Sequence, residues 1–128
     1  MATFTLNKKE RLKRKILWDH VFAEGQQVKS YPFLLYYYKT ELPEGIQFQA
    51  GFAVPKKNIR KAVSRNRVKR LMREVYRKEK PGLKARLVGS YALVFLYLGK
   101  ELPVYTLVSK NMTAILQKWI AHETTQNN

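Results

Sequence analysis

The chain has 128 residues and no cysteine, and its 25 lysine and arginine residues outnumber nine acidic residues, giving a formal net charge of +16. The lack of cysteine excludes a disulfide framework and a thiolate metal site, and no apolar run reaches the ~18 residues needed to span a bilayer. Because so large an excess of positive charge opposes folding unless an anion offsets it, polyanion binding is the leading class of function.

A short amphipathic helix is predicted near the N-terminus. Apolar side chains recur at helical spacing around Trp18 over residues 13–23, and Gly25 ends the pattern. The basic segment before the helix, residues 1–12, is expected to be mobile.

Two strands are predicted to follow this helix. Residues 28–39 are rich in tyrosine, phenylalanine and leucine, with Pro32 near the start of the run, where a strand tolerates a missing amide donor. Over residues 46–54, apolar side chains alternate with small or polar ones, so one face of this second strand is expected to be buried. Pro55 ends it.

A long basic helix is predicted at residues 62–79, ended by Pro81-Gly82, with one further helical turn at residues 83–87. Its apolar side chains share one face, which is expected to pack on the sheet: Val68, Leu71, Met72 and Val75. The region from Lys56 to Lys80 holds 12 basic residues and two acids, too few for the charge pairing of an ordinary solvated helix. Because the arginine fork suits phosphate contact, the helix is predicted to bind nucleic acid.

One more strand and one more helix are predicted to complete the chain. Residues 91–98 are continuously apolar between two glycines, as in a strand covered on both faces. Pro103 can open the last helix, and residues 123–128 are expected to form a frayed polar tail. The order helix, strand, strand, long helix, strand, helix indicates an α+β fold, a small α/β sandwich forming one domain over residues 1–128.

Aromatic residues suggest a second binding surface. Tyr36, Tyr37 and Tyr38 are consecutive, so the middle ring is expected on one face of the sheet and its neighbours on the other. Trp18 and Phe22 lie one turn apart on the first helix. Such rings can stack the bases of single-stranded RNA, at ~1–3 kcal/mol each. The alternative is that they pack the core and only their polar tips reach solvent.

Groups for catalysis by the protein itself are not apparent. A metal-dependent nuclease needs clustered carboxylates, whereas the nine acids are scattered and Asp19 is the only aspartate. His20 and His122 lie near opposite ends of the chain and are expected to be ordinary surface residues. We therefore expect no catalytic residue here, and any chemistry is expected to belong to a partner.

A segment of the long helix resembles a known family. Residues 62–74 read AVSRNRVKRLMRE, which is similar to the Arg-Asn-Arg signature of the bacterial ribonuclease P protein subunit. The resemblance extends upstream through GFAVPKK at residues 51–57 and to Arg11-Leu12, Trp18, Val21-Phe22 and Gly25. It covers most of the chain up to Arg77.

The resemblance implies a role beside a catalytic RNA that removes the 5′ leader of precursor tRNA, with Mg²⁺ acting through the RNA subunit. It also implies a left-handed strand-helix-strand crossover, against the usual rule. The residues it assigns to RNA-subunit binding are Arg65, Asn66, Arg67, Lys69, Arg70 and Arg73. The residues it assigns to leader binding are Arg11, Arg14, Trp18, Phe22, Tyr36, Lys56 and Lys57. Whether this chain itself holds a metal ion stays open.

The chain departs from the family pattern at three places. Trp18 stands where the family often has phenylalanine, Pro55 replaces a usual small residue, and residues 58–61 lack a glycine that some members have. The first change keeps stacking possible, whereas the other two affect the path of the loop.

Three other functions are alternatives for a chain of this composition. A ribosomal or other structural RNA-binding protein would share the charge and the small α+β build. A polybasic membrane-surface protein is disfavoured because the basic residues lie opposite a core-facing stripe, with no face to insert into lipid. A self-sufficient nuclease is disfavoured by the scattered acids. We expect a cytoplasmic protein whose partners are the catalytic RNA and precursor tRNA, with neither membrane nor DNA among them.

Overall fold

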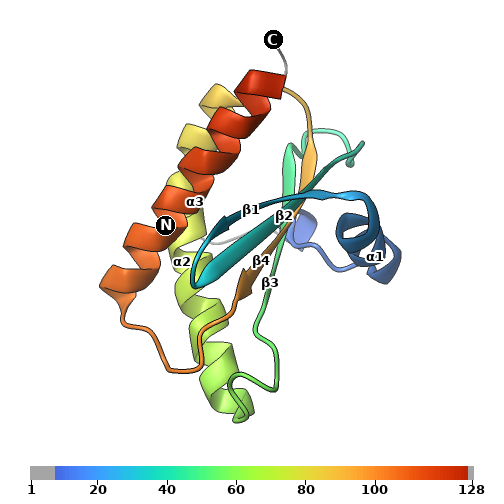
Figure 1. Ribbon diagram of the computed structural model, residues 1–128. Coiled ribbons are helices and arrows are strands. Elements are labelled where there is room, and N and C mark those ends of the chain that lie inside the picture. The colour runs from blue at the N-terminus through green and yellow to red at the C-terminus, as the bar shows by residue number, and fades with distance from the viewer. Residues whose placement is uncertain (1–7, 127–128) are drawn as a thin grey trace.

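The computed structural model describes residues 8–126, and its helices and strands form three layers (Figure 1). The elements are η1 (Lys8–Glu10), α1 (Lys15–Glu24), β1 (Gln26–Ser30), β2 (Phe33–Lys39), β3 (Phe48–Ala53), α2 (Ala62–Arg86), β4 (Tyr91–Tyr97) and α3 (Tyr105–Gln126). Helix α1 covers one face of the sheet, whereas α2 and α3 lie side by side on the other. No helix within residues 8–126 is long and apolar enough to cross a membrane.

The sheet has four strands in the order β1-β2-β4-β3. β2 pairs antiparallel with both β1 and β4, whereas β3 pairs parallel with β4. Parallel neighbours need a crossover connection, and α2 supplies it between β3 and β4. The predicted α+β class is confirmed, with a mixed sheet whose two inner strands are β2 and β4, the second of which is the predicted apolar run.

The single strand predicted at residues 28–39 is wrong. The chain reverses at Tyr31-Pro32, so residues 26–39 form the β1–β2 hairpin, in which Val28 pairs with Leu35. Pro32 has no amide hydrogen to give to a ladder, and its carbonyl accepts a hydrogen bond from the Leu98 amide at 2.7 Å. The proline therefore marks a turn between two strands, and the predicted order gains one strand.

The long helix does not end at Pro81-Gly82 as predicted but runs on to Arg86. The reason lies in Leu83, which is buried in the core beneath α3 and whose carbonyl accepts the amide of Leu87 at 3.1 Å. Burial of this leucine outweighs the local cost of a proline in the helix. The separate helical turn expected at residues 83–87 is thus the last turn of α2.

Both ends of the described chain are more ordered than expected. Within the segment predicted to be mobile, residues 8–10 form η1, and Leu12 is buried with its amide bonded to the Ala50 carbonyl at 3.0 Å. In the predicted tail, α3 continues to Gln126, and buried Glu123 accepts a hydrogen bond from the Tyr91 hydroxyl at 2.6 Å. Residues 1–7 and 127–128 lie outside the described part of the chain.

The two faces of the sheet hold separate cores. The larger one lies against α2 and α3, with Trp119 at its centre and the rings of Tyr91 and Tyr37 at 5.3 and 5.6 Å, centroid to centroid. The smaller one lies under α1 and includes Ala92 and Val94. Because alternate residues of β4 enter both cores, the prediction of a strand covered on both faces is confirmed.

Candidate nucleic-acid interface

A hollow of about 310 Å³ opens between the N-terminal segment, β3 and α2. We call it the Trp18 cleft. Its basic lining comes from two elements far apart in sequence, and its floor is aromatic. The side chains used below are Arg11, Lys13, Trp18, Phe52, Lys69 and Arg73.

The N-terminal segment is fixed at the mouth of the Trp18 cleft. The indole Nε1 of Trp18 donates to the Leu12 carbonyl at 2.8 Å, and a Cβ added at position 51 would overlap the Trp18 ring, so Gly51 gives that ring its space. The ammonium of Lys80 on α2 lies 2.7 Å from the Glu10 carboxylate, and both side chains are mostly buried. These contacts hold the intervening Arg11 beside the cleft.

Aromatic rings continue from the Trp18 cleft across the α1 side of the sheet. The centroid of Phe22 lies 6.1 Å from that of Trp18 and 4.8 Å from that of Tyr36. Phe22 is 43% exposed, and the other two rings are half-buried. As the alternation predicted, Tyr37 points to the opposite face and is buried there. Trp18, Phe22 and Tyr36 thus form an aromatic track with partly open faces.

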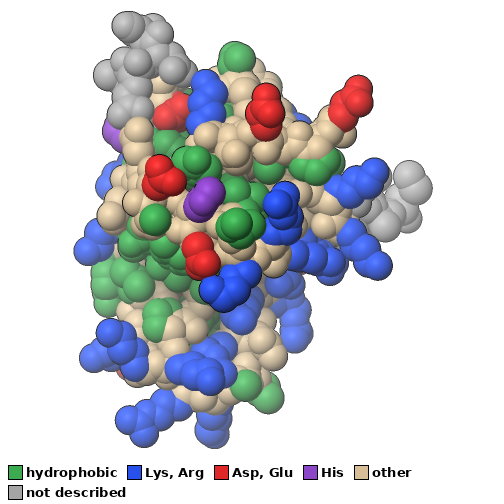
Figure 2. Space-filling model, turned by 90° about the vertical axis from the view of Figure 1, so that its right-hand side faces the viewer, with side chains coloured by type: hydrophobic (Ala, Val, Ile, Leu, Met, Phe, Trp, Pro, Cys, Tyr) green, Lys and Arg blue, Asp and Glu red, His purple; other side chains and the backbone are tan. Residues whose placement is uncertain are grey.

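Positive charge is concentrated where α2 meets the Trp18 cleft. The guanidinium of Arg73 lies over the Phe52 ring, 5.6 Å from its centroid. Burial lowers the pKa of Arg73, and the neighbouring charges of Arg11 and Arg70 lower it further. Each cation thus destabilises the others, and a bound phosphate would relieve this repulsion. Figure 2 shows lysine and arginine covering the lower part of this side of the molecule, toward the start of α2.

The structure separates the six residues predicted to bind the RNA subunit. Lys69 and Arg73 line the Trp18 cleft, together with Arg11 and Trp18 from the predicted leader set. Arg65 is turned toward the loop before α2, and its Nη1 donates to the carbonyls of Ile59 at 3.0 Å and Arg60 at 2.7 Å. The other three of the six are exposed on α2: Asn66, Arg67 and Arg70. The six side chains therefore point to three places: the Trp18 cleft, the loop before α2 and the exposed face of α2. Their spacing in the sequence does not distinguish these places.

The predicted leader residues are also divided. Arg14 lines a different hollow, of about 260 Å³, beside His20 and the loop after β2. Lys13, which we did not single out, lines the Trp18 cleft instead. The only sequence signal for Lys13 was its place in the basic run at residues 8–15, which does not say which side chain points inward.

Lys56 and Lys57 are exposed on the loop between β3 and α2. This loop is tied to the fold at its centre, where the side-chain amide of Asn58 donates to the Leu98 carbonyl at 3.0 Å and Ile59 is buried. Arg65 closes its far end. The loop without glycine is therefore held by side chains rather than by a special backbone conformation.

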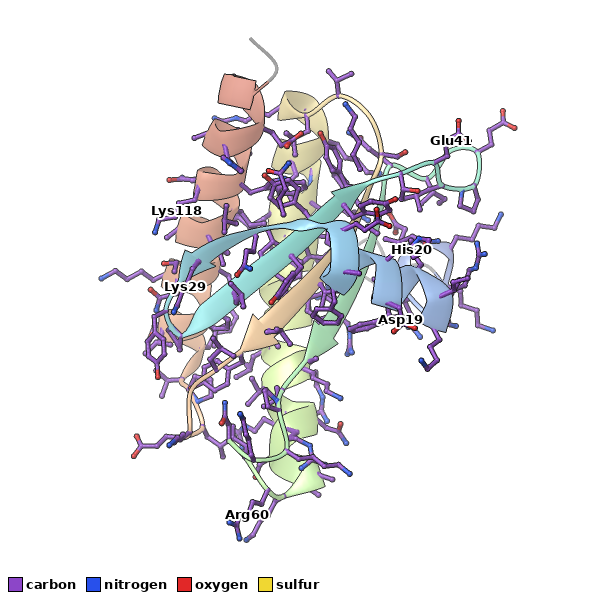
Figure 3. The ribbon with its side chains drawn as sticks, turned by 45° about the vertical axis from the view of Figure 1, so that its right-hand side comes forward. Asp19, His20, Lys29, Glu41, Arg60 and Lys118 are labelled. Atoms are coloured by element: carbon purple, nitrogen blue, oxygen red, sulfur yellow. The ribbon has the colours of Figure 1, made fainter. Side chains whose placement is uncertain are left out.

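No acidic residue or histidine of the described chain is in the lining of the Trp18 cleft. Within residues 8–126, no group of three or more histidine, cysteine or acidic residues could hold a metal ion. Asp19 pairs with Lys15 at 3.1 Å, and Figure 3 shows it beside exposed His20 on α1. His122 is not an ordinary surface residue as predicted, because its Nδ1 is hydrogen-bonded to the hydroxyl of buried Tyr37.

Comparison with known proteins gives one consistent family. Residues 6–119 match the family model described as Ribonuclease P. The ribonuclease P protein component of Chlorobium phaeobacteroides is 34% identical over 125 residues, covering 88% of this chain and 86% of the relative. That of Porphyromonas gingivalis is 38% identical over 114 residues, covering 87% and 83%. The RNase P proteins of Staphylococcus aureus (TM-score 0.70, 21% identity, 86% and 94% covered) and Thermotoga maritima (0.66, 25%, 85% and 96%) have a similar fold.

Proposed function

The chain belongs to the ribonuclease P protein family and is the protein subunit of that endoribonuclease, and we propose that it works by binding two RNAs at once. One is the single-stranded 5′ leader of precursor tRNA, and the other is the catalytic RNA that cuts it. The observation that carries this proposal is the Trp18 cleft, where cations and partly open aromatic rings meet.

The leader is proposed to follow the aromatic track. Its bases would stack on Trp18, Phe22 and Tyr36, and its phosphates would meet the cations of the Trp18 cleft, which are Arg11, Lys13, Lys69 and Arg73. Arg14 lies outside this path, so we give it at most a long-range electrostatic role.

The catalytic RNA is proposed to meet the exposed side of α2. Asn66, Arg67 and Arg70 are available there, and the arginine fork can contact phosphate with two parallel hydrogen bonds. Arg65 acts indirectly, because it fixes the loop that carries Lys56 and Lys57. That loop would lie between the two RNAs.

Divalent metal is proposed to belong to the RNA partner. Mg²⁺ would supply an activated water and neutralise charge on the phosphate that is cut. Within residues 8–126, three or more acidic, histidine or cysteine side chains do not come together at any place where they could hold a metal ion. The task of this chain is then to position RNA, in the cytoplasm where tRNA matures.

Reconstitution with the cognate catalytic RNA at low Mg²⁺ tests this function. We expect the protein to stimulate removal of the 5′ leader, and Lys69→Ala/Arg73→Ala to lose most of that stimulation. The matched control Lys29→Ala/Lys118→Ala also removes two positive charges, from β1 and α3 on the side of the molecule away from α1 (Figure 3), and should keep the stimulation. The assignment fails if the protein gives no stimulation, or if it cleaves precursor tRNA without the RNA. Equal loss of stimulation in both double variants would mean that the effect comes from net charge and not from the Trp18 cleft.

A further inference from the structure

A second hollow, of about 450 Å³, lies around α2 from the Trp18 cleft, where the first turns of α2 meet the start of α3. We call it the α2–α3 pocket. The connection from β4 to α3 passes beside the first half of α2 here (Figure 1). Its lining residues are Val63, Arg67, Arg70, Leu71, Glu74 and Tyr105.

Apolar side chains are exposed to solvent in and beside the α2–α3 pocket. Val63 is 81% exposed and Tyr105 is 38% exposed, and half-buried Leu71 of α2 packs against the larger core. Adjacent Val104 is 66% exposed. A volume near 450 Å³ falls in the ~300–1,000 Å³ range of small-ligand sites, and contiguous exposed apolar surface commonly marks a binding site.

The rim of the α2–α3 pocket is cationic. Arg67 and Arg70 are exposed along it. The Lys78 ammonium lies 3.2 Å from the Tyr105 hydroxyl and 5.4 Å from its ring centroid, which fixes the ring and adds a further charge. Glu74, the acid in the lining, is paired with Arg77. The rim therefore favours an anionic occupant.

We propose that the α2–α3 pocket takes one unpaired nucleobase of an RNA, stacked against Tyr105, with the flanking phosphates on Arg67 and Arg70. A base offers the flat apolar face that the ring and floor accept, and its phosphates offer the charge that the rim requires. A second copy of the chain would instead bring more positive charge against these arginines, because each chain carries a formal net charge of +16. This inference rests on the proposed function and adds a base-binding position to the α2 surface proposed to meet the catalytic RNA.

Binding of the cognate catalytic RNA by ring variants tests the inference. Tyr105→Ala should weaken affinity about tenfold, equivalent to about 1.4 kcal/mol, whereas Tyr105→Phe and the control Leu102→Ala should stay within about twofold of wild type. Leu102 is a comparably exposed apolar residue outside the pocket lining. Unchanged affinity of Tyr105→Ala, or equal loss in Tyr105→Phe, overturns the base pocket.

Photo-cross-linking gives an independent measurement. With p-benzoylphenylalanine at position 105 in the reconstituted complex, we expect cross-links to a nucleotide outside the RNA helices. Cross-links confined to a second copy of the chain or to paired nucleotides overturn the inference. If wild-type protein stimulates leader removal while Tyr105→Ala binds unchanged, the pocket alone is wrong. If wild type does not bind the catalytic RNA at all, the proposed function fails and the base pocket fails with it.

Discussion

On the side of the sheet covered by α2 and α3, the rings of Trp119, Phe48 and Tyr91 are buried, whereas on the α1 side Phe22 is 43% exposed and Tyr36 is half-buried. Both sides belong to the same four strands and alternate along them residue by residue. The difference comes from the helices. Two helices of 25 and 22 residues cover one side, and a helix of 10 residues covers the other.

A short helix cannot bury a whole sheet face, so aromatic surface stays open beside α1. Aromatic side chains that are buried in a core on one side of the sheet therefore have partly open faces on the other. Positive charge also lies beside this open side. Arg11 and Lys13 of the N-terminal segment and Lys69 and Arg73 of α2 line the Trp18 cleft there. The sheet thus has a closed side that stabilises the fold and an open side proposed to bind the leader. Substitutions on the closed side should lower stability, and those on the open side should lower leader affinity.

The largest expected effect is on the closed side. Trp119→Ala empties the centre of the larger core and should lower the free energy of unfolding by about 3–5 kcal/mol, with a melting temperature lower by roughly 3–5 °C per kcal/mol. Phe22→Ala, on the open side, should cost under about 1 kcal/mol, because its ring is 43% exposed. Thermal and denaturant unfolding measure both. Similar losses in the two variants would remove the distinction between the sides.

The next effect is on binding. Phe22→Ala/Tyr36→Ala removes two rings whose centroids lie 4.8 Å apart and should weaken affinity for precursor tRNA by about tenfold or more, since each stacked base contributes ~1–3 kcal/mol. Affinity for mature tRNA, which has no leader, should be little changed. Tyr31→Ala is the control, because Tyr31 is exposed at the β1–β2 turn away from the aromatic track. Equal weakening for precursor and mature tRNA would disprove the leader path.

Local patterns were enough to predict much of the fold. The apolar run of β4, the alternation of Tyr36 to Tyr38 and the apolar face of α2 each depend on near neighbours in sequence. What failed depended on distant contacts. Pro81 reads as a helix end until buried Leu83 is placed under α3, and Pro32 reads as a strand start until β1 is seen to pair with β2.

The sequence predicts a set of candidate site residues but not how they are arranged in space. The basic composition of α2 and its motif pointed to RNA, yet their spacing could not show that Arg65 turns back to the loop while Lys69 joins the Trp18 cleft. Whether Lys13 or Arg14 points into the Trp18 cleft depends on how the N-terminal segment leads into α1. No sequence pattern marks Tyr105 as a site residue, because it is singled out only by its position beside α2 in the folded chain.

The smallest expected effect is on stability at high pH, and it tests whether water is excluded from the core on the closed side. Tyr76 is buried against the rings of Phe52 and Phe95, whose centroids lie 5.9 and 5.5 Å from its own, and among residues 8–126 its hydroxyl has no hydrogen-bond partner. Burial raises the pKa of Tyr76, and the nearby charge of Glu10 raises it further. Folding thus favours the neutral phenol, so this contribution to stability is complete below the ordinary tyrosine pKa of about 10 and declines above it, where the unfolded chain loses the proton first.

Tyr76→Phe therefore separates packing from ionisation. At neutral pH the change should alter stability by less than about 1 kcal/mol, because it removes a buried polar atom that lacks a partner and keeps the ring. Above pH of about 10 the variant should lose stability less steeply than wild type, although Tyr37 and Tyr91, whose pKa values burial also raises, still contribute. Exposed Tyr31→Phe is the control for melts from pH 8 to about 11. An alkaline limb identical to that of wild type would mean that Tyr76 can reach water, and that the closed side of the sheet is less tightly sealed than its packing indicates.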